Sequence, residues 1–295
     1  MQSRDNDISG IFLMNQQSKD NQPILPEVAN IVAVGAGKGG VGKSTIAVHL
    51  AVGLKRKGFK VGLLDCDIYG PSIATMTGIE GTSPQLNDNR KIIPFDANGL
   101  KVISMANFIP KDTAVIWRGP MVHGAVKQFL SDVDWGSLDY MIIDLPPGTG
   151  DPPLTLAQTI GVTGAVIVAT PQPLALNDAM RAAQMYQKLG IHILGIVENM
   201  SYFICPNCNT IHDIFGRGGV KKAADKANIA VLAEIPLNLS IRTNTDSAHV
   251  EDNFDKTKNP QIAPILEEMI NKLIKQVEFR NENYPKPEPL VVKKS

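Results

Sequence analysis

Short apolar runs rich in β-branched residues alternate with longer amphipathic segments along most of the chain. The runs that we expect to form strands cover residues 31–36, 60–64, 101–104, 140–143, 165–169, 193–197 and 230–235. Strands that are apolar on both faces are typical of parallel sheets covered by helices. The pattern therefore predicts an α/β fold with a doubly wound, mostly parallel sheet.

The last strongly periodic segment, residues 261–277, predicts a helix with one apolar stripe. This stripe contains Ile262, Ile265, Leu266, Met269, Ile270, Leu273, Ile274 and Val277. The opposite face mixes Glu267 and Glu268 with Lys272 and Lys275, whereas a helix lying on a membrane would have a basic polar face. We expect this helix to pack against the sheet.

The two ends of the chain lack such periodicity. Residues 1–29 are polar, and the segment from 279 to 295 contains Pro285, Pro287 and Pro289. Such composition does not support a packed core. We therefore predict a polar N-terminal extension over residues 1–29, one domain over 30–278, and a disordered tail over 279–295.

Composition limits the classes of partner. A hydrophobic content of 43 % supports one large core, and 29 basic residues balance 29 acidic residues. Zero net charge provides no global field for capturing nucleic acid or an anionic membrane. No apolar run is long enough to span a bilayer, and Asp5, Asp7 and Asp20 do not fit a signal peptide. We expect a cytoplasmic protein that binds neither nucleic acid nor membrane.

A glycine-rich stretch follows the first predicted strand. Gly37, Gly42, Lys43 and Ser44 match the pattern G-x-x-x-x-G-K-[ST], in which backbone N–H groups surround phosphate oxygens. Lys43 is expected to reach the β- and γ-phosphates, and the Ser44 hydroxyl to bind Mg²⁺. The pattern predicts a nucleotide triphosphatase whose binding loop consists of Gly37, Lys38, Gly39, Gly40, Val41, Gly42, Lys43, Ser44 and Thr45.

Acidic residues end two of the predicted strands. Asp144 follows a buried run, the arrangement in which a carboxylate holds the Mg²⁺ shell. Asp65 and Asp67 follow the second strand and lie on the same side of it. One of the two could approach Mg²⁺ or the attacking water while the other holds the loop; capping of the next segment is the alternative. Cys66 is expected to pack into the sheet.

Cys205 and Cys208 form a C-x-x-C pair among turn-forming residues. Two thiolates supply half of a tetrahedral site, and the spacing alone leaves zinc, iron–sulfur, thiol redox chemistry or no site open. His212, with His192 or His249, could complete a zinc set. In a two-fold dimer, a pair near the axis would become four cysteines.

The stretch from Lys38 to Ser44 resembles the deviant Walker A motif of MinD, Mrp and nitrogenase iron protein. Asp-Leu-Pro-Pro-Gly-Thr-Gly-Asp at 144–151 and Trp-Arg-Gly-Pro-Met-Val at 117–122 narrow this resemblance to the Mrp/ApbC iron–sulfur cluster carrier ATPases, over residues 30 to 275. It implies an ATP-dependent homodimer in which Lys38 reaches the partner's nucleotide. It further implies that Asp67 positions water and that Asn199 contacts the adenine.

The same resemblance implies that Cys205 and Cys208 of two subunits hold a labile [4Fe–4S] cluster. The protein would receive this cluster from a donor protein and transfer it to apo-proteins while hydrolysing ATP slowly. Arg217 and the glycines after it resemble a family segment, without an assigned role. Residues 1–29 lack the additional domain and the four-cysteine motif that precede this domain in some relatives.

Three other functions compete with this interpretation. A MinD/ParA-like positioning ATPase would form the same ATP-dependent homodimer but would carry no cluster. A reductase resembling nitrogenase iron protein would also bridge a cluster between subunits, but its cysteines are far apart in sequence. A zinc-structured scaffold without a nucleotide response is the third.

Overall fold

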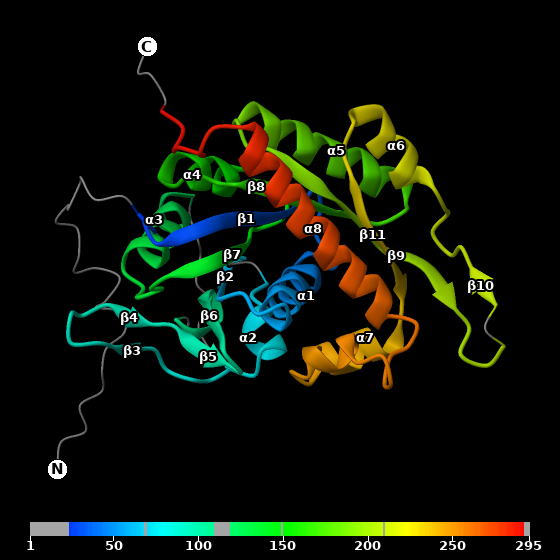
Figure 1. Ribbon diagram of the computed structural model, residues 1–295, viewed down its shortest axis with the longest axis horizontal. Helices are drawn as coiled ribbons and strands as arrows, with labels where there is room; N and C mark the ends of the chain where they lie inside the picture. Colours follow the sequence, from blue (N-terminus) through cyan, green and yellow to red (C-terminus); the bar gives the residue numbers. More distant parts are fainter. Residues whose placement is uncertain (1–23, 68–69, 109–118, 149, 209, 292–295) are drawn as a thin grey trace.

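The computed structural model describes residues 24–67, 70–108, 119–148, 150–208 and 210–291. In this part of the chain a nine-stranded sheet is covered by helices on both faces (Figure 1). The fold confirms the predicted doubly wound α/β architecture.

Every predicted strand is present in the sheet. Its strands run in the order β5-β6-β2-β7-β1-β8-β9, and both β11 and β10 also pair with β9. Pairing is parallel except for β5 with β6 and β10 with β9. The strands are β1 (Val28–Ala36), β2 (Val61–Asp65), β5 (Phe95–Ala97), β6 (Leu100–Ser104), β7 (Leu138–Asp144), β8 (Gly164–Ala169), β9 (Ile193–Ile204), β10 (Ile211–His212) and β11 (Val231–Leu237), and a separate antiparallel ribbon joins β3 (Gln85–Leu86) to β4 (Ile92–Ile93).

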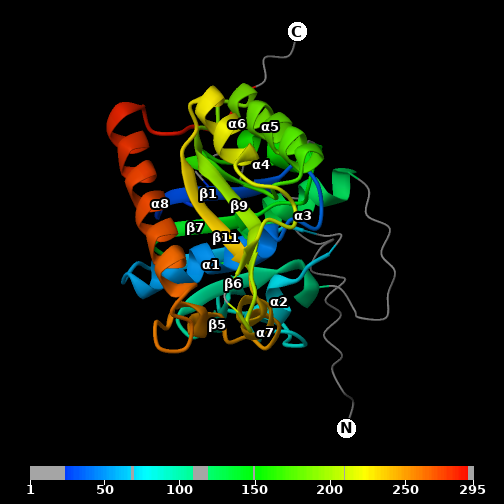
Figure 2. The same ribbon diagram turned by 90° about the vertical axis from the view of Figure 1, so that its right-hand side faces the viewer.

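The helices form two layers that enclose the sheet (Figure 2). One face is covered by α3 (Gly119–Ser131), α4 (Asp151–Thr159), α5 (Pro173–Lys188) and α6 (Gly219–Ala227). The other is covered by α1 (Lys43–Arg56), α2 (Ile73–Met76), α7 (Leu239–Asp246) and α8 (Ala263–Asn283), together with the 3-10 helix η3 (Val250–Phe254); a further 3-10 helix, η2 (Met105–Asn107), follows β6. Each interface between sheet and helices is a continuous apolar core.

Helix α8 packs its apolar stripe on the sheet, as predicted, but continues to Asn283. The predicted domain boundary at residue 278 therefore lies inside a helix. Beyond the helix, the Leu290 amide donates a hydrogen bond to the Ala157 carbonyl at 2.7 Å. Pro287 and Leu290 thus lie against the domain, in contrast to the predicted disordered tail. Residues 1–23 and 292–295 lie outside the described residues.

None of the helices in the described ranges is long and apolar enough to cross a bilayer.

The parallel register brings the chemistry together at one edge of the sheet. Asp65 of β2 pairs with Asp144 of β7, and Asp144 also pairs with Val34 of β1. Because parallel strands end at a common edge, the loop after β1 and both carboxylates meet there.

His49 is a fully buried polar residue of α1. Its Nδ1 lies 2.7 Å from the Thr45 carbonyl, and its Nε2 lies 3.0 Å from Nδ2 of Asn253. A neutral ring satisfies both contacts, with Nδ1–H donating to Thr45 and Nε2 accepting from Asn253. Burial lowers the pKa of His49 to about 4.

We predict that His49 makes the protein less stable in acid. In the unfolded chain His49 binds a proton near pH 6.5, whereas in the folded protein it does so only near pH 4. The free energy of unfolding therefore decreases as the pH falls from about 6.5 to about 4. Between pH 7 and pH 5 the wild type should lose about 2 kcal/mol more unfolding free energy than His49→Gln. Urea unfolding at both pH values measures this difference. Equal losses in the two proteins would contradict it.

Candidate functional site

The loop after β1 requires glycine at two positions because other chain segments approach its backbone. A Cβ at Gly37 would lie 2.1 Å from the backbone carbon of Asp178 in α5. A Cβ at Gly42 would lie 2.2 Å from Nδ2 of Asn199, and Gly42 has a left-handed φ of 82° at the start of α1. The loop is therefore packed tightly between α5 and β9 and leads into the N-terminus of α1, where backbone N–H groups are available to phosphate.

Lys43 is enclosed by acidic side chains. Its Nζ lies 2.6 Å from Oδ1 of Asp144 and 3.2 Å from Oδ2 of Asp67. The Ser44 hydroxyl donates to Oδ2 of Asp144 at 2.5 Å. Lys43 is 6 % exposed and Asp144 is 0 % exposed. The structure thus brings Lys43, Ser44, Asp67 and Asp144 together, as the sequence motifs indicated.

The charges of Lys43 and the neighbouring carboxylates stabilise each other in this buried cluster. Burial alone would lower the pKa of Lys43, but the charges of Asp144 and Asp67 outweigh it and raise that pKa. Burial raises the pKa of Asp144, and burial together with the charge of Asp144 raises the pKa of Asp65 to about 7. Lys43 is therefore the cation that allows carboxylates to ionise in a buried position.

Asp65 and Asp67 have different roles. Oδ1 of Asp65 accepts the Asp67 amide at 3.0 Å, and its Oδ2 accepts the Ser104 hydroxyl at 2.8 Å. Asp65 therefore holds the start of the next loop, whereas Asp67 faces Lys43. Cys66 is fully buried in the sheet, as expected.

The segment after Asp144 is hydrogen-bonded to the end of β1, directly before the phosphate loop. The Leu145 amide donates to Val34, and the Gly148 amide donates to Ala36 at 2.8 Å. These bonds hold the segment after Asp144 beside the start of the phosphate loop. Thr149 lies outside the described residues, as do Trp117 and Arg118 of the upstream motif.

Lys38 is half-buried on the phosphate loop and makes no hydrogen bond or ion pair with another described residue. Asn199 lies within β9 rather than after a strand, and its Nδ2 donates to the Val41 carbonyl at 2.9 Å. One N–H of the Asn199 side-chain amide is thus already bonded to the backbone of the phosphate loop. Its contact with adenine stays a prediction.

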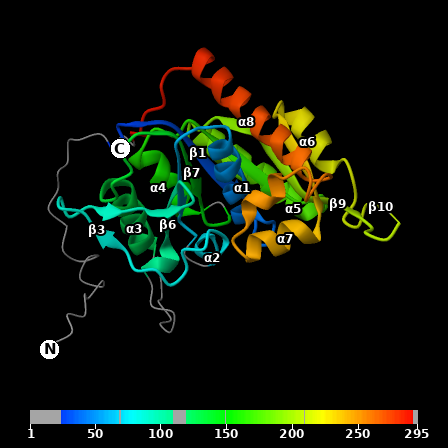
Figure 3. The same ribbon diagram turned by 60° about the horizontal axis from the view of Figure 1, so that its bottom comes forward.

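The two cysteines lie at the turn between β9 and β10, in a hairpin that projects from the carboxyl edge of the sheet (Figures 1 and 3). The Cys205 amide donates to the Thr210 carbonyl at 3.0 Å, and Sγ of Cys208 lies 3.2 Å from the Thr210 hydroxyl. Cys205 is partly exposed and Cys208 is exposed. The Thr210 hydroxyl lowers the pKa of the Cys208 thiol, which favours the thiolate that binds metal.

The hypothesis of a zinc site completed by histidine is wrong for the described residues. They contain no group of three or more His, Cys, Asp or Glu side chains that could hold a metal ion. The His212 ring lies beside Phe203, and the His192 ring lies 5.0 Å from Tyr284, between centroids. The cysteine pair therefore has two free thiols and no third ligand from its own described residues.

Sequence reasoning missed Glu198, which is 1 % exposed. The Ser201 hydroxyl donates to its carboxylate at 2.5 Å. The only signal was an unusual polar segment, Glu-Asn-Met-Ser, inside an apolar run. Arg217 now has a position as well: its guanidinium lies 6.0 Å from the Tyr202 ring centroid, beside the cysteine hairpin.

A loop of this shape, facing a carboxylate from the neighbouring strand, defines the P-loop nucleotide triphosphatases. Residues 27–281 match the family described as ParA, the NUBPL iron-transfer P-loop NTPases. The chain belongs to this family.

Relatives agree with this assignment. An iron–sulfur cluster carrier protein of Deinococcus radiodurans is 54 % identical over 226 residues, which cover 77 % of this chain and 64 % of that protein. A protein of the same name from Pseudomonas fragi is 49 % identical, with 84 % of this chain and 86 % of the relative covered. The chain thus spans somewhat less than two thirds of the Deinococcus protein.

Solved structures show the same fold. A nucleotide-binding protein of Archaeoglobus fulgidus in complex with ADP superimposes with a TM-score of 0.68 at 40 % identity, over 76 % of this chain and 88 % of the other. The cell division ATPase MinD of Pyrococcus furiosus has a TM-score of 0.62 at 22 % identity, over 84 % and 99 %. At this level of identity, the similarity to MinD shows a shared fold and nothing further.

Lys43 should stabilise the nucleotide-free protein. Lys43→Ala removes the cation between Asp144 and Asp67, and an uncompensated buried charge costs about 3 kcal/mol. Lys55→Ala is the matched control at the other end of α1, because it removes only the exposed ion pair to Glu251 and should cost less than about 1 kcal/mol. Chemical unfolding without nucleotide compares the two. Equal costs would show that Lys43 is not the compensating charge.

Proposed function

We propose that the protein is a homodimeric, ATP-dependent carrier that holds a labile [4Fe–4S] cluster on Cys205 and Cys208 of two subunits and transfers it to apo-proteins. The cluster is its cargo. The observation that supports this most strongly is the course of β9, which contacts the phosphate loop through Asn199 and ends one residue before Cys205. One strand thus links the nucleotide site to the thiols.

The membership of this chain in an iron-transfer family and the names of its relatives support iron–sulfur chemistry at these thiols. Two free cysteines supply half of the ligands that a [4Fe–4S] cluster needs. A second copy related by a two-fold axis supplies the other half. Free cysteines also fit a reducing compartment such as the cytoplasm.

Exposed apolar side chains around the same edge of the sheet support a dimer. They come from segments that follow the carboxyl ends of β7, β8, β9 and β11, and large apolar groups gathered around a functional edge favour association. They are Leu154, Leu174, Ile214 and Leu239. A second copy docked on this edge would bring the two cysteine hairpins together.

The residues of the nucleotide site fit ATP with Mg²⁺. The Ser44 hydroxyl and the Asp144 carboxylate present adjacent oxygens, which are the ligands that Mg²⁺ prefers. When bound, Mg²⁺ would neutralise charge on the phosphates. Lys43 would exchange its carboxylate partners for phosphate oxygens, which releases Asp67 to orient the attacking water. Among the described residues none is placed as a strong general base, so hydrolysis would be slow.

We propose that Lys38 acts across the dimer. Its ammonium group, without a partner among the described residues of its own subunit, would contact the nucleotide of the second copy. ATP bound at both sites would then draw the subunits together and move the cysteine hairpins relative to each other. This contact would couple the state of the nucleotide to retention or release of the cluster.

The cluster assignment predicts the iron content of the protein. After reconstitution without oxygen, the wild type should contain about two irons and two sulfides per subunit, one four-iron cluster for each pair of subunits. A Cys205→Ala, Cys208→Ala variant should contain almost none, because its ligands are missing. Cys66→Ala is the control and should keep the full amount. A double variant that still binds and transfers the cluster would refute the assignment.

The two lysines of the phosphate loop should behave differently. Lys38→Ala should bind ATP within about threefold of the wild type but hydrolyse it at least about tenfold more slowly, since it loses only the contact across the dimer. Lys43→Ala should lose binding and hydrolysis together. Nucleotide titration and single-turnover hydrolysis separate these effects. Wild-type hydrolysis by Lys38→Ala would contradict the role across the dimer.

A further inference from the structure

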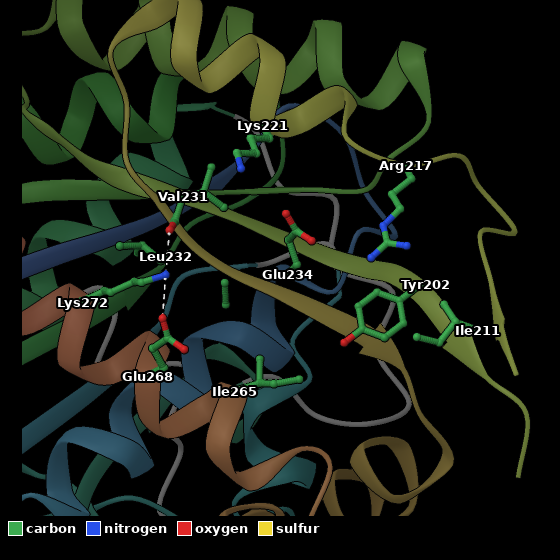
Figure 4. Close-up of a pocket in the computed structure, with 11 residues that line it drawn as sticks. Tyr202, Ile211, Arg217, Lys221, Val231, Leu232, Glu234, Ile265, Glu268 and Lys272 are labelled. Atoms are coloured by element: carbon green, nitrogen blue, oxygen red, sulfur yellow. Dashed lines mark hydrogen bonds and ion pairs between the residues drawn. The ribbon is translucent and has the colours of Figure 1, made fainter. Parts of the chain in front are cut away.

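A groove of about 480 Å³ runs along β11 beside the cysteine hairpin (Figure 4). We propose that it binds an extended, acidic segment of the apo-protein that accepts the cluster, by adding this segment as a strand to β11. This inference rests on the proposed carrier function and specifies where the acceptor docks.

Strand β11 is open on its outer side. Among the described strands it pairs with β9 alone. The Val231 carbonyl lies 3.5 Å from Nζ of Lys272, a side chain of α8 rather than a neighbouring strand. Edge strands offer unpaired N–H and C=O groups, and extended peptides bind by pairing with them. The groove is therefore shaped for one additional strand.

The two walls of the groove differ in charge. On the α8 side, Lys272 is paired with Glu268 at 3.0 Å, so this wall is nearly neutral. On the α6 side, Arg217 and Lys221 face one acidic lining residue, Glu234 (Figure 4).

The two cations of this wall are weakly compensated. Arg217 reaches Asp213 only at 3.9 Å, and both side chains are exposed. Lys221 is exposed and has no ion pair with a described residue. The residues that line the groove thus include three cations, Arg217, Lys221 and Lys272, against two carboxylates, and an acidic side chain of the acceptor would balance the remaining positive charge.

The groove is also close to the thiols. Tyr202 and Ile211 line it, and they belong to the two strands whose connecting turn holds Cys205 and Cys208. Tyr202 precedes Cys205 by three residues, which spans about 10 Å in a strand. A segment bound along β11 would hold the body of the acceptor next to the cluster. Docking on β11 and transfer at the cysteine hairpin would then take place side by side.

The charged wall is tested with two matched variants, Lys221→Glu and Lys222→Glu. Both lysines are exposed on α6, but only Lys221 lines the groove. With aconitase stripped of its cluster as the probe, Lys221→Glu should raise the KM for the acceptor about tenfold, with the maximal transfer rate within about twofold. Lys222→Glu should behave like the wild type. The same KM in both variants would overturn the proposal.

Iron content and ATP hydrolysis are measured on the same samples, because neither residue contacts the cysteines or the phosphate loop. Both should be unchanged in Lys221→Glu. A wild type that binds no cluster would refute the carrier function itself, which separates that failure from failure of the docking site.

Amide hydrogen exchange tests strand addition directly. Exchange of residues 231–237 should slow when the stripped aconitase is added, because their outer N–H groups become paired. Unchanged exchange would overturn strand addition. Protection that is already present and disappears when residues 1–23 are deleted would assign the groove to this chain's own N-terminal segment instead. Protection that grows with the protein's own concentration would assign it to a second copy.

Discussion

The ion cluster of Lys43 with Asp144 and Asp67 is the interaction on which the site depends. It lies where the ends of β1, β2 and β7 meet, and its members are almost excluded from water. Buried carboxylates are costly unless a cation and hydrogen bonds compensate them. In the proposed mechanism, a nucleotide that offers phosphate oxygens to Lys43 changes the electrostatic balance at the ends of these three strands.

Strand β9 connects the nucleotide site to the thiols. Asn199 donates to the Val41 carbonyl of the phosphate loop, and the same strand continues to the turn with Cys205 and Cys208. Next to Asn199, Glu198 is buried and accepts the Ser201 hydroxyl, which fixes the strand where its polar segment crosses the core. The strand is thus held in the core beside the phosphate loop, whereas its cysteine end lies at the exposed turn to β10. Such an arrangement suits a cargo that must be held and then released.

Much of this could be predicted from sequence, because apolar runs and the phosphate-loop motif are local signals. The strands and the grouping of Lys43, Ser44 and Asp144 follow from them. The continuation of β9 through Asn199 to Ile204 could not, because its polar residues interrupt the apolar pattern and are satisfied only by distant partners. Likewise, the chain topology places the His192 ring beside Tyr284 and not beside the cysteines. The continuation of α8 past residue 278 could not be predicted either, because Arg280 is buried there by contacts with the rest of the domain.

The central claim is that two copies of this chain share one cluster through a pair of cysteines from each. Native mass spectrometry of protein reconstituted without oxygen tests it most directly, since it weighs the assembly and its contents together. The account predicts a dimer that contains a single [4Fe–4S] cluster, in addition to any bound nucleotide. A monomer with its own zinc ion or its own cluster would contradict it.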